Sequence, residues 1–130
     1  MTKNTVLTLG VILTIVGLWG FFQDPVLGTF EVDVTHNIIH LVTGLLGLWY
    51  GTRSEDQAKA YAKVFGVIYG LVTIVGFIQT DSVLGLFGVN LADNVFHLLL
   101  AVIFLWVGFA GSRGMMTQGG TSGGMGGGQM

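Results

Sequence analysis

The sequence predicts an all-α, polytopic membrane protein: a four-helix bundle made of two tandem helical hairpins, with both termini on the cytoplasmic side. Composition is the first reason, because 52% of the 130 residues are hydrophobic and only 9% are charged, with a mean hydropathy of +0.76. Soluble domains carry about 25% charged residues. The other two reasons are four long apolar runs and a second half that repeats the first.

The four apolar runs have the length of membrane-spanning helices. They cover about residues 5–22, 35–51, 61–78 and 91–111. A helix needs about 20 residues to cross a bilayer, with a range of about 17–25, so the second run barely qualifies. The first run lacks the small-residue cleavage site of a signal peptide. We predict one transmembrane domain over residues 1–111, with repeat one at about 5–52 and repeat two at about 61–111.

The basic residues predict the orientation. Lys3 precedes the first run, Arg53, Lys59 and Lys63 flank the turn between the second and third, and Arg113 follows the fourth. The other two loops, 23–34 and 79–90, carry acidic residues but no Lys or Arg. The positive-inside rule therefore places both termini in the cytoplasm. The Gly- and Met-rich segment 112–130 is expected to be a flexible cytoplasmic tail.

The internal repeat places residues 10–51 over residues 66–108 with a single-residue gap. The polar matches are Gln23 with Gln79, Asn37 with Asn94, and His40 with His97. Both outer loops also contain V-L-G-x-F, which is apolar enough to fold back onto the bundle. An even number of spans per repeat implies a pseudo-twofold axis along the membrane normal.

Capping residues mark the outer ends of the second and fourth helices. Asp33 and Asn90 occupy equivalent positions just before these helices, and both residue types are good N-caps. Asp93 follows Asn90 by three residues and resembles the second half of a capping box. The S-E-D-Q run at residues 54–57 has the same pattern before the third helix.

Small residues and polar residues share one face of the second and fourth helices. The stripe in the second helix is Asp33, Asn37, His40, Gly44, Gly47 and Gly51, and that in the fourth is Asn90, Asn94, His97, Ala101, Phe104 and Gly108. Matching stripes in the first and third helices are Gly10, Thr14 and Gly17, and Gly66, Gly70 and Thr73. Because small residues mark close helix approach in membranes, we predict packing through these glycines and Ala101.

Asn37, His40, Asn94 and His97 form a candidate polar cluster that points into the bundle. We expect mainly a structural role, since hydrogen bonds between membrane helices contribute about 0.6–2 kcal/mol each. The alternatives are a pocket for a lipid headgroup or solute, a proton-responsive pair, and haem or metal ligation. We predict no cofactor and no metal, because Gly44 and Gly47 favour close packing. The sequence contains no pairing of a nucleophile with a base that would indicate catalysis.

The run LFGVNLADNVFHLLLAVIFL, residues 86–105, carries an N-x-x-D-N-x-x-H-L core that is echoed by FEVDVTHNIIHLVTGLLGL in the first half. In these motifs the chain resembles domain of unknown function (DUF) 4383, a family of small bacterial four-helix membrane proteins. The resemblance covers about residues 5–111, and His36 stands where the second repeat has Asp93. It implies a four-helix bundle in a bacterial cytoplasmic membrane and supplies no active site.

The expected function is that of a non-enzymatic structural or interaction module. Its expected partners are the lipid bilayer and either a second copy of the chain or another membrane protein. The rival is a binding or transport protein that uses the Asn/His cluster. A net charge of −2 gives no reason to expect nucleic acid. The absence of cysteine excludes disulfides, thiolate metal sites and thiol nucleophiles.

Overall fold

The computed structural model describes the backbone of residues 1–118 and the side chains of residues 1–110. Four helices form in the described residues: α1 (Thr2–Gly20), α2 (Val34–Gly51), α3 (Glu55–Gln79) and α4 (Leu91–Gln118). The predicted all-α fold with four helices is confirmed. The loop between α3 and α4 adds a small antiparallel hairpin, β1 (Ser82–Val83) and β2 (Phe87–Gly88), in which Val83 pairs with Phe87.

Two helices are longer than the apolar runs suggested. The α3 helix begins at Glu55, where the Ser54 side chain accepts a hydrogen bond from the Gln57 backbone N–H at 3.1 Å, as the S-E-D-Q pattern predicted. The α4 helix continues beyond residue 111 to Gln118, so the fourth helix is longer than predicted and includes residues 112–118 of the predicted tail. The rest of that predicted tail, residues 119–130, lies outside the described residues.

Three helices of the described part are long and apolar enough to cross a membrane: Thr2–Gly20, Glu55–Gln79 and Leu91–Ala110. The prediction that all four runs reach that level fails for α2. Its first two turns hold His36, Asn37 and His40, which lower the hydropathy of an 18-residue helix. All three of these side chains are buried, however, so the polarity of α2 faces inward.

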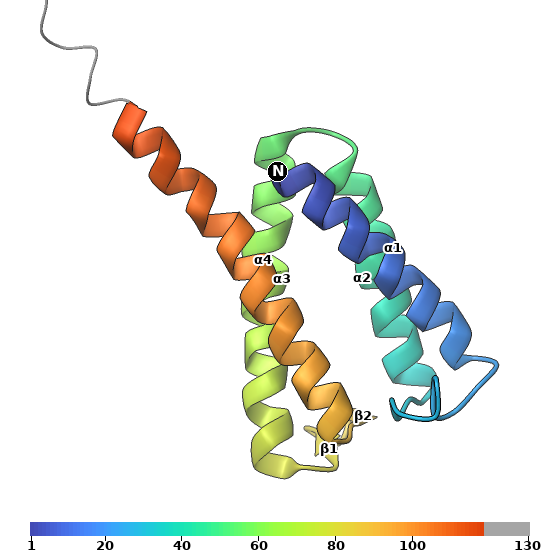
Figure 1. The fold of residues 1–130 in the computed structure, drawn as a ribbon. Helices are drawn as coiled ribbons and strands as arrows, with labels where there is room; N and C mark the ends of the chain where they lie inside the picture. The colour runs from blue at the N-terminus through green and yellow to red at the C-terminus, as the bar shows by residue number, and fades with distance from the viewer. Residues whose placement is uncertain (119–130) are drawn as a thin grey trace, which may run out of the picture.

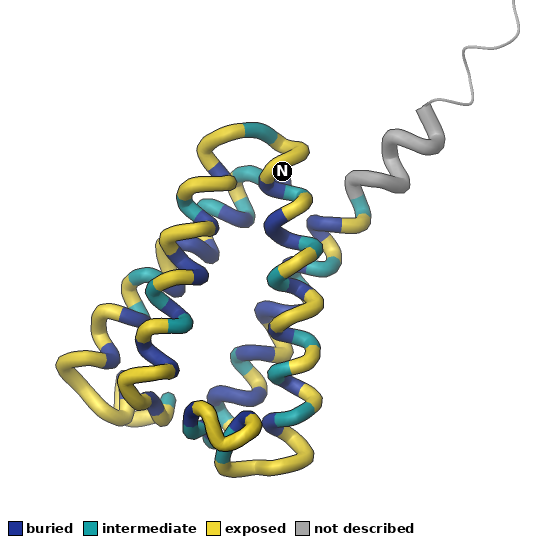
Figure 2. The backbone as a smooth tube through the Cα atoms, turned by 180° about the vertical axis from the view of Figure 1, so that it is seen from behind, coloured by how far each residue is buried: buried dark blue, intermediate teal, exposed yellow. Residues whose placement is uncertain are grey.

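The helices are arranged as two tight pairs. Figure 1 shows α1 alongside α2 and α3 alongside α4, and contacts between the two pairs are sparser. Buried residues line the inner faces and exposed residues the outer faces of the bundle (Figure 2). An apolar core of α1, α3 and α4 residues joins the two pairs and includes Leu13, Tyr61 and Phe104. The Tyr61 hydroxyl also donates to the Thr43 carbonyl of α2 at 2.7 Å.

Glycines set the close approach within each pair. A Cβ at Gly10 would lie 3.0 Å from the Gly44 carbonyl oxygen, and one at Gly17 would lie 2.7 Å from the Leu41 nitrogen. A Cβ at Gly108 would lie 3.0 Å from the Lys63 nitrogen. Because these neighbours are backbone atoms, larger residues would push the helices apart. The predicted tight packing is confirmed.

The remaining predicted packing positions divide into four that are confirmed and one that is wrong. Contacts at Gly47, Gly51 and Gly66 are close, and Ala101 is buried. No atom lies within 4 Å of a Cβ built at Gly70. The reason is the direction in which Gly70 points around the helix axis. The buried face of α3 runs through Ala62, Gly66, Tyr69, Thr73 and Gly76. Gly70 lies one position away from that face.

The loops that precede α2 and α4 fold back onto the bundle, as their apolar sequence predicted. Val26 and Val83 are buried, and each V-L-G-x-F turn pairs its first residue with its last. Leu27 and Leu84 adopt φ values of 55° and 54°. Three hydrogen bonds join the loop and helix start of the first half to those of the second half. They are Gly88 N–H to Asp33 Oδ2 at 2.7 Å, Glu31 N–H to Asp93 Oδ2 at 3.1 Å, and Asn90 Nδ2 to the Thr29 carbonyl at 2.8 Å.

Candidate ligand site at the histidine cluster

The candidate site is a cluster of the three histidines of the chain. His36 and His40 lie four residues apart on α2, so they share one helix face. Asp33 fixes the start of α2 by accepting from the His36 backbone N–H at 2.8 Å. His97 comes from α4, so the cluster joins the two helix pairs.

A reciprocal cap orients the start of α4. Asn90 Oδ1 accepts from the Asp93 N–H and Asp93 Oδ2 accepts from the Asn90 N–H, both at 2.9 Å. The predicted capping box is therefore confirmed, with Asp in the position that Glu usually takes. Asp33 and Asp93 each also accept from the opposite loop. These carboxylates hold the outer ends of α2 and α4 beside each other.

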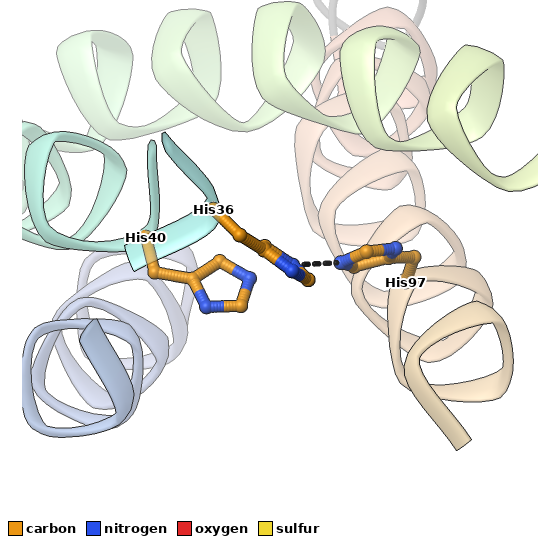
Figure 3. A group of neighbouring side chains, drawn as sticks. All are labelled: His36, His40 and His97. Carbon is orange, nitrogen blue, oxygen red and sulfur yellow. Dashed lines mark hydrogen bonds between the residues drawn. The ribbon is translucent and has the colours of Figure 1, made fainter. Parts of the chain in front are cut away.

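The three imidazole rings are in direct contact. Figure 3 shows His36 between His40 and His97, with a dashed line from His36 to His97. That line joins the two Nε2 atoms, which are 3.4 Å apart. The ring centroids of His36 and His40 lie 4.4 Å apart, and those of His40 and His97 lie 5.9 Å apart. One nitrogen of each ring lies within 4.8 Å of the other two.

The rings are buried with few hydrogen-bond partners. Their exposed fractions are 1% for His36, 2% for His40 and 1% for His97. Among the described residues, both nitrogens of His40 and the Nδ1 atoms of the other two rings have no hydrogen-bond partner. A neutral imidazole carries one donor and one acceptor. Burying such a group unpaired costs about 1–3 kcal/mol, so the His40 ring is poorly satisfied by the protein itself.

A cavity of about 340 Å³ lies beside the cluster. Its polar lining comes from the three histidines, Thr43 and Tyr69. Its apolar lining includes Phe65 of α3 and four residues of the β1–β2 segment: Val83, Leu84, Leu86 and Phe87. The β hairpin therefore helps to enclose a space that has imidazole rings on one wall and apolar side chains on the others.

Comparison with known proteins identifies the family. The family model described as "Domain of unknown function (DUF4383)" matches residues 3–110. The chain belongs to this family. No curated protein matches it, and no solved structure matches it. The predicted resemblance to DUF4383 is thus confirmed. Because the family has no assigned function, the role of the site must be inferred from its geometry.

The structure of this DUF4383 chain divides the predicted Asn/His cluster. His40 and His97 meet, but both asparagines face glycines of their own helix pair. Asn94 Nδ2 donates to the Gly76 carbonyl at 3.1 Å, and the Asn37 side chain lies where a Cβ on Gly20 would be. Each asparagine thus packs against a glycine of the neighbouring helix in its own pair, and Asn94 also hydrogen-bonds to it.

Sequence reasoning left His36 out of the site. The available signal was its spacing of four from His40, which places two histidines on one face of a helix. The alignment of the repeats hid that signal, because the position matches Asp93 rather than a histidine. The prediction rests on polar residues that recur in both repeats, such as His40 and His97. His36 does not recur, yet it lies between these two histidines.

The arrangement limits the chemistry of the site. Imidazole nitrogens bind hydrogen-bonding ligands and metal ions such as zinc and copper. A haem held between His40 and His97 would need the space that the His36 ring fills, since that ring lies 4.4 Å and 5.4 Å from the other two. Thr43 Oγ1 donates to the Ile39 carbonyl at 2.7 Å, so this hydroxyl is already engaged within its helix.

Proposed function

We propose that this DUF4383 protein is a four-span protein of a bacterial cytoplasmic membrane that acts as a non-enzymatic structural or interaction module. One observation carries the proposal: polar side chains of the helices turn inward and large apolar ones turn outward. On α2 the buried residues include His36 and His40, whereas Ile38, Val42 and Leu45 are about half exposed. Such a surface suits lipid and the apolar faces of other membrane proteins.

The same inside-out pattern supports α2 as the fourth span. Its hydropathy is lowered by residues that contact protein rather than lipid. Polar groups at membrane depth are tolerated where they face the interior of a bundle. Its length of 18 residues falls within the range of about 17–25 that spans a bilayer.

Charge supports an orientation with both termini in the cytoplasm. Lys3 lies at the end of the bundle where the N-terminus meets the α2–α3 turn (Figure 1). Arg53 lies in that turn, and Lys59 lies near the start of α3. The N-terminal ammonium pairs with Glu55 at 3.3 Å at this end. The opposite end carries the acidic loops that flank α2 and α4. The positive-inside rule favours the basic end as cytoplasmic.

Matched local features support a tandem repeat of two hairpins. Gly20 faces Asn37 in the first half, and Gly76 faces Asn94 in the second. Both outer turns place Leu and then Gly at positive φ, with both glycines at 68°. Two parallel hairpins of this kind would have a pseudo-twofold axis along the membrane normal.

The proposed partners are lipid together with a second copy or another membrane protein. Gly47 and Gly51 already contact Tyr61 and Leu7 of the same chain, so they are not free to mediate association. An interface would instead use exposed large side chains such as Trp49 and Trp106, which are 57% and 63% exposed. Crosslinking in native membranes should yield a dimer or a mixed adduct, and a purely monomeric pattern would count against this part of the proposal.

A second candidate function is the binding of a small ligand. The observation that favours it is the cavity of about 340 Å³ with imidazoles on one wall. Apolar enclosure with a few polar groups is typical of small-molecule sites, which span about 300–1,000 Å³. A solute or lipid group with one hydrogen-bonding end would suit that lining.

The topology can be tested with single cysteines, because the natural chain has none. Thr52→Cys reports the α2–α3 turn, and Thr29→Cys reports the first outer loop; both positions are exposed. In intact cells a membrane-impermeant maleimide should label Thr29→Cys only, and permeabilised cells should label both. Labelling of Thr52→Cys in intact cells would reverse the orientation, and recovery of the protein in the soluble fraction would refute membrane insertion.

A further inference from the structure

We propose that His36, His40 and His97 form a binding site for a single late first-row transition-metal ion, zinc or copper, with one coordination position open toward the cavity. This goes beyond a structural or interaction role, because it gives the site a ligand of defined chemistry. The site is assembled from both helix pairs, since two ligands come from α2 and the third from α4. An ion bound there would join the two pairs directly.

The spacing of the nitrogens fits such an ion. A zinc–imidazole bond is about 2.0–2.1 Å long, so two ligands of a tetrahedral ion lie about 3.3–3.4 Å apart. The Nε2 atoms of His36 and His97 are 3.4 Å apart. One nitrogen of His40 lies within 4.8 Å of both partners. Closing that gap to about 3.4 Å takes a shift of about 1.4 Å or less.

The unpaired nitrogens point to a missing ligand. His40 is 2% exposed, and neither of its nitrogens has a hydrogen-bond partner among the described residues. Its ring packs against that of His36, which lies between His40 and His97 (Figure 3). A bound cation would use one nitrogen of each ring, and those three atoms lie within 4.8 Å of one another. Three imidazoles with two of them four residues apart on a helix are a donor set that zinc and copper both accept.

The surrounding charges suit a cation. Asp33 lies three residues before His36 and Asp93 four residues before His97, so both carboxylates lie at the same end of the bundle as the cluster. Their oxygens accept backbone N–H groups at 2.7–3.1 Å, which holds them in place. Opposite charge near a buried ion offsets part of its desolvation cost.

The fourth coordination position would face the cavity. Three protein ligands leave one position of a tetrahedral ion for water or a small anion. The cavity of about 340 Å³ next to the rings has room for such a ligand, and Thr43 and Tyr69 line it. The site therefore differs from a closed structural metal site, in which the protein supplies all four ligands.

The test uses the full-length protein, purified in detergent with a histidine-free tag. All three histidines of the chain lie in the cluster, so no other imidazole competes. The protein is equilibrated with Zn²⁺ alone or Cu⁺ alone, freed of excess metal and analysed for bound metal. We expect about one ion per chain for at least one of the two metals. His40→Ala and His97→Ala should each weaken binding by at least about 100-fold, beyond the 10–100-fold typical of groups that only support a ligand.

Thr73→Val is the matched control, because Thr73 is a buried residue of α3 whose hydroxyl donates to the Tyr69 carbonyl and which lines neither the cavity nor the histidine cluster. It should bind the metal within about threefold of the natural chain. X-ray absorption of the loaded natural protein adds a readout that does not depend on variants folding: three imidazole ligands at about 2.0–2.1 Å are expected. Absence of both metals from the natural protein, unchanged binding in the folded His variants, or a shell of methionine sulfur would each overturn the proposal.

Discussion

Replacement of Gly44 by alanine tests the packing of α1 against α2 most directly. A Cβ at this position would lie 2.5 Å from the Thr14 nitrogen and 2.8 Å from the Gly10 carbonyl oxygen. It would also meet the Thr14 hydroxyl. Two of these three neighbours are backbone atoms, so no side-chain rotation relieves the overlap. The helices must separate by about 0.9 Å for the shortest backbone contact to reach 3.4 Å, where ordinary van der Waals contact begins.

The size of the effect follows from two opposing terms. Overpacking of a core costs about 1–3 kcal/mol, and rigid backbone neighbours favour the upper end of that range. Alanine regains about 0.5–1 kcal/mol relative to glycine inside a helix. We therefore expect Gly44→Ala to lower the free energy of unfolding by about 2 kcal/mol. Gly70→Ala, with no atom within 4 Å of its new Cβ, should instead raise it by up to about 1 kcal/mol.

The assay is reversible unfolding of the purified protein in mixed micelles, followed by helical circular dichroism. The two variants should differ by about 3 kcal/mol, which is roughly 100-fold in the unfolding equilibrium constant. Both add the same methyl group to a helical glycine, so the comparison removes the effect of composition. Equal stabilities for Gly44→Ala and Gly70→Ala would refute the packing argument, and a Gly44→Ala variant as stable as the natural chain would do the same.

Three further predictions concern other single substitutions. Asn94→Ala removes the 3.1 Å hydrogen bond to the Gly76 carbonyl and should lower the free energy of unfolding in micelles by about 0.5–2 kcal/mol. Asp93→Ala removes the acceptor for the Glu31 and Asn90 N–H groups and should cost about 2–4 kcal/mol in that assay; a loss below about 0.5 kcal/mol would contradict its linking role. Leu71→Arg places a charge on an outward position of α3 that is 59% exposed, and at a cost of about 2.5–3.5 kcal/mol it should reduce the membrane-inserted fraction in a fractionation assay. Gln57→Arg, near the basic end of α3, should leave that fraction unchanged.

Local patterns in the sequence were enough to predict most of the helical framework. Asp33 and Asn90 cap α2 and α4 because their short side chains reach the N–H groups three residues on. Gly10 and Gly17 face α2 because seven residues make nearly two full turns of a helix, which aligns them on one face. These signals depend on neighbours within one or two turns, so a single sequence contains them.

Angular offsets and contacts between distant segments were harder to predict. Gly70 fits a GxxxG pattern with Gly66, yet the face that meets α4 passes through Tyr69 and Thr73 instead. Two positions in one pattern cannot reveal which of several nearby faces meets a neighbour. The asparagines were misplaced for a related reason, because they share a stripe with the histidines but lie against Gly20 and Gly76.

The central role of His36 depends on how α4 meets α2 across the two hairpins. Its Nε2 atom is 3.4 Å from that of His97, 61 positions later in the chain. Nothing in the local pattern around His36 specifies that contact. The internal repeat pointed the other way, since it matched His36 with a carboxylate that faces the opposite loop. Symmetry in the sequence therefore predicted the scaffold better than it predicted the site.

The location of the histidines follows from how the fold distributes its close contacts. Glycines and asparagines are used within each helix pair, where they bring α1 against α2 and α3 against α4. Contacts between the pairs are sparser and depend on larger groups, such as the Tyr61 hydroxyl that bonds to the Thr43 carbonyl. The histidines lie on this same boundary, so a ligand held by them adds to the weaker of the two kinds of interface. Binding there would add to the apolar core of α1, α3 and α4 that already joins the two hairpins and would leave each hairpin intact. A ligand that prefers the joined arrangement would therefore shift the bundle toward it.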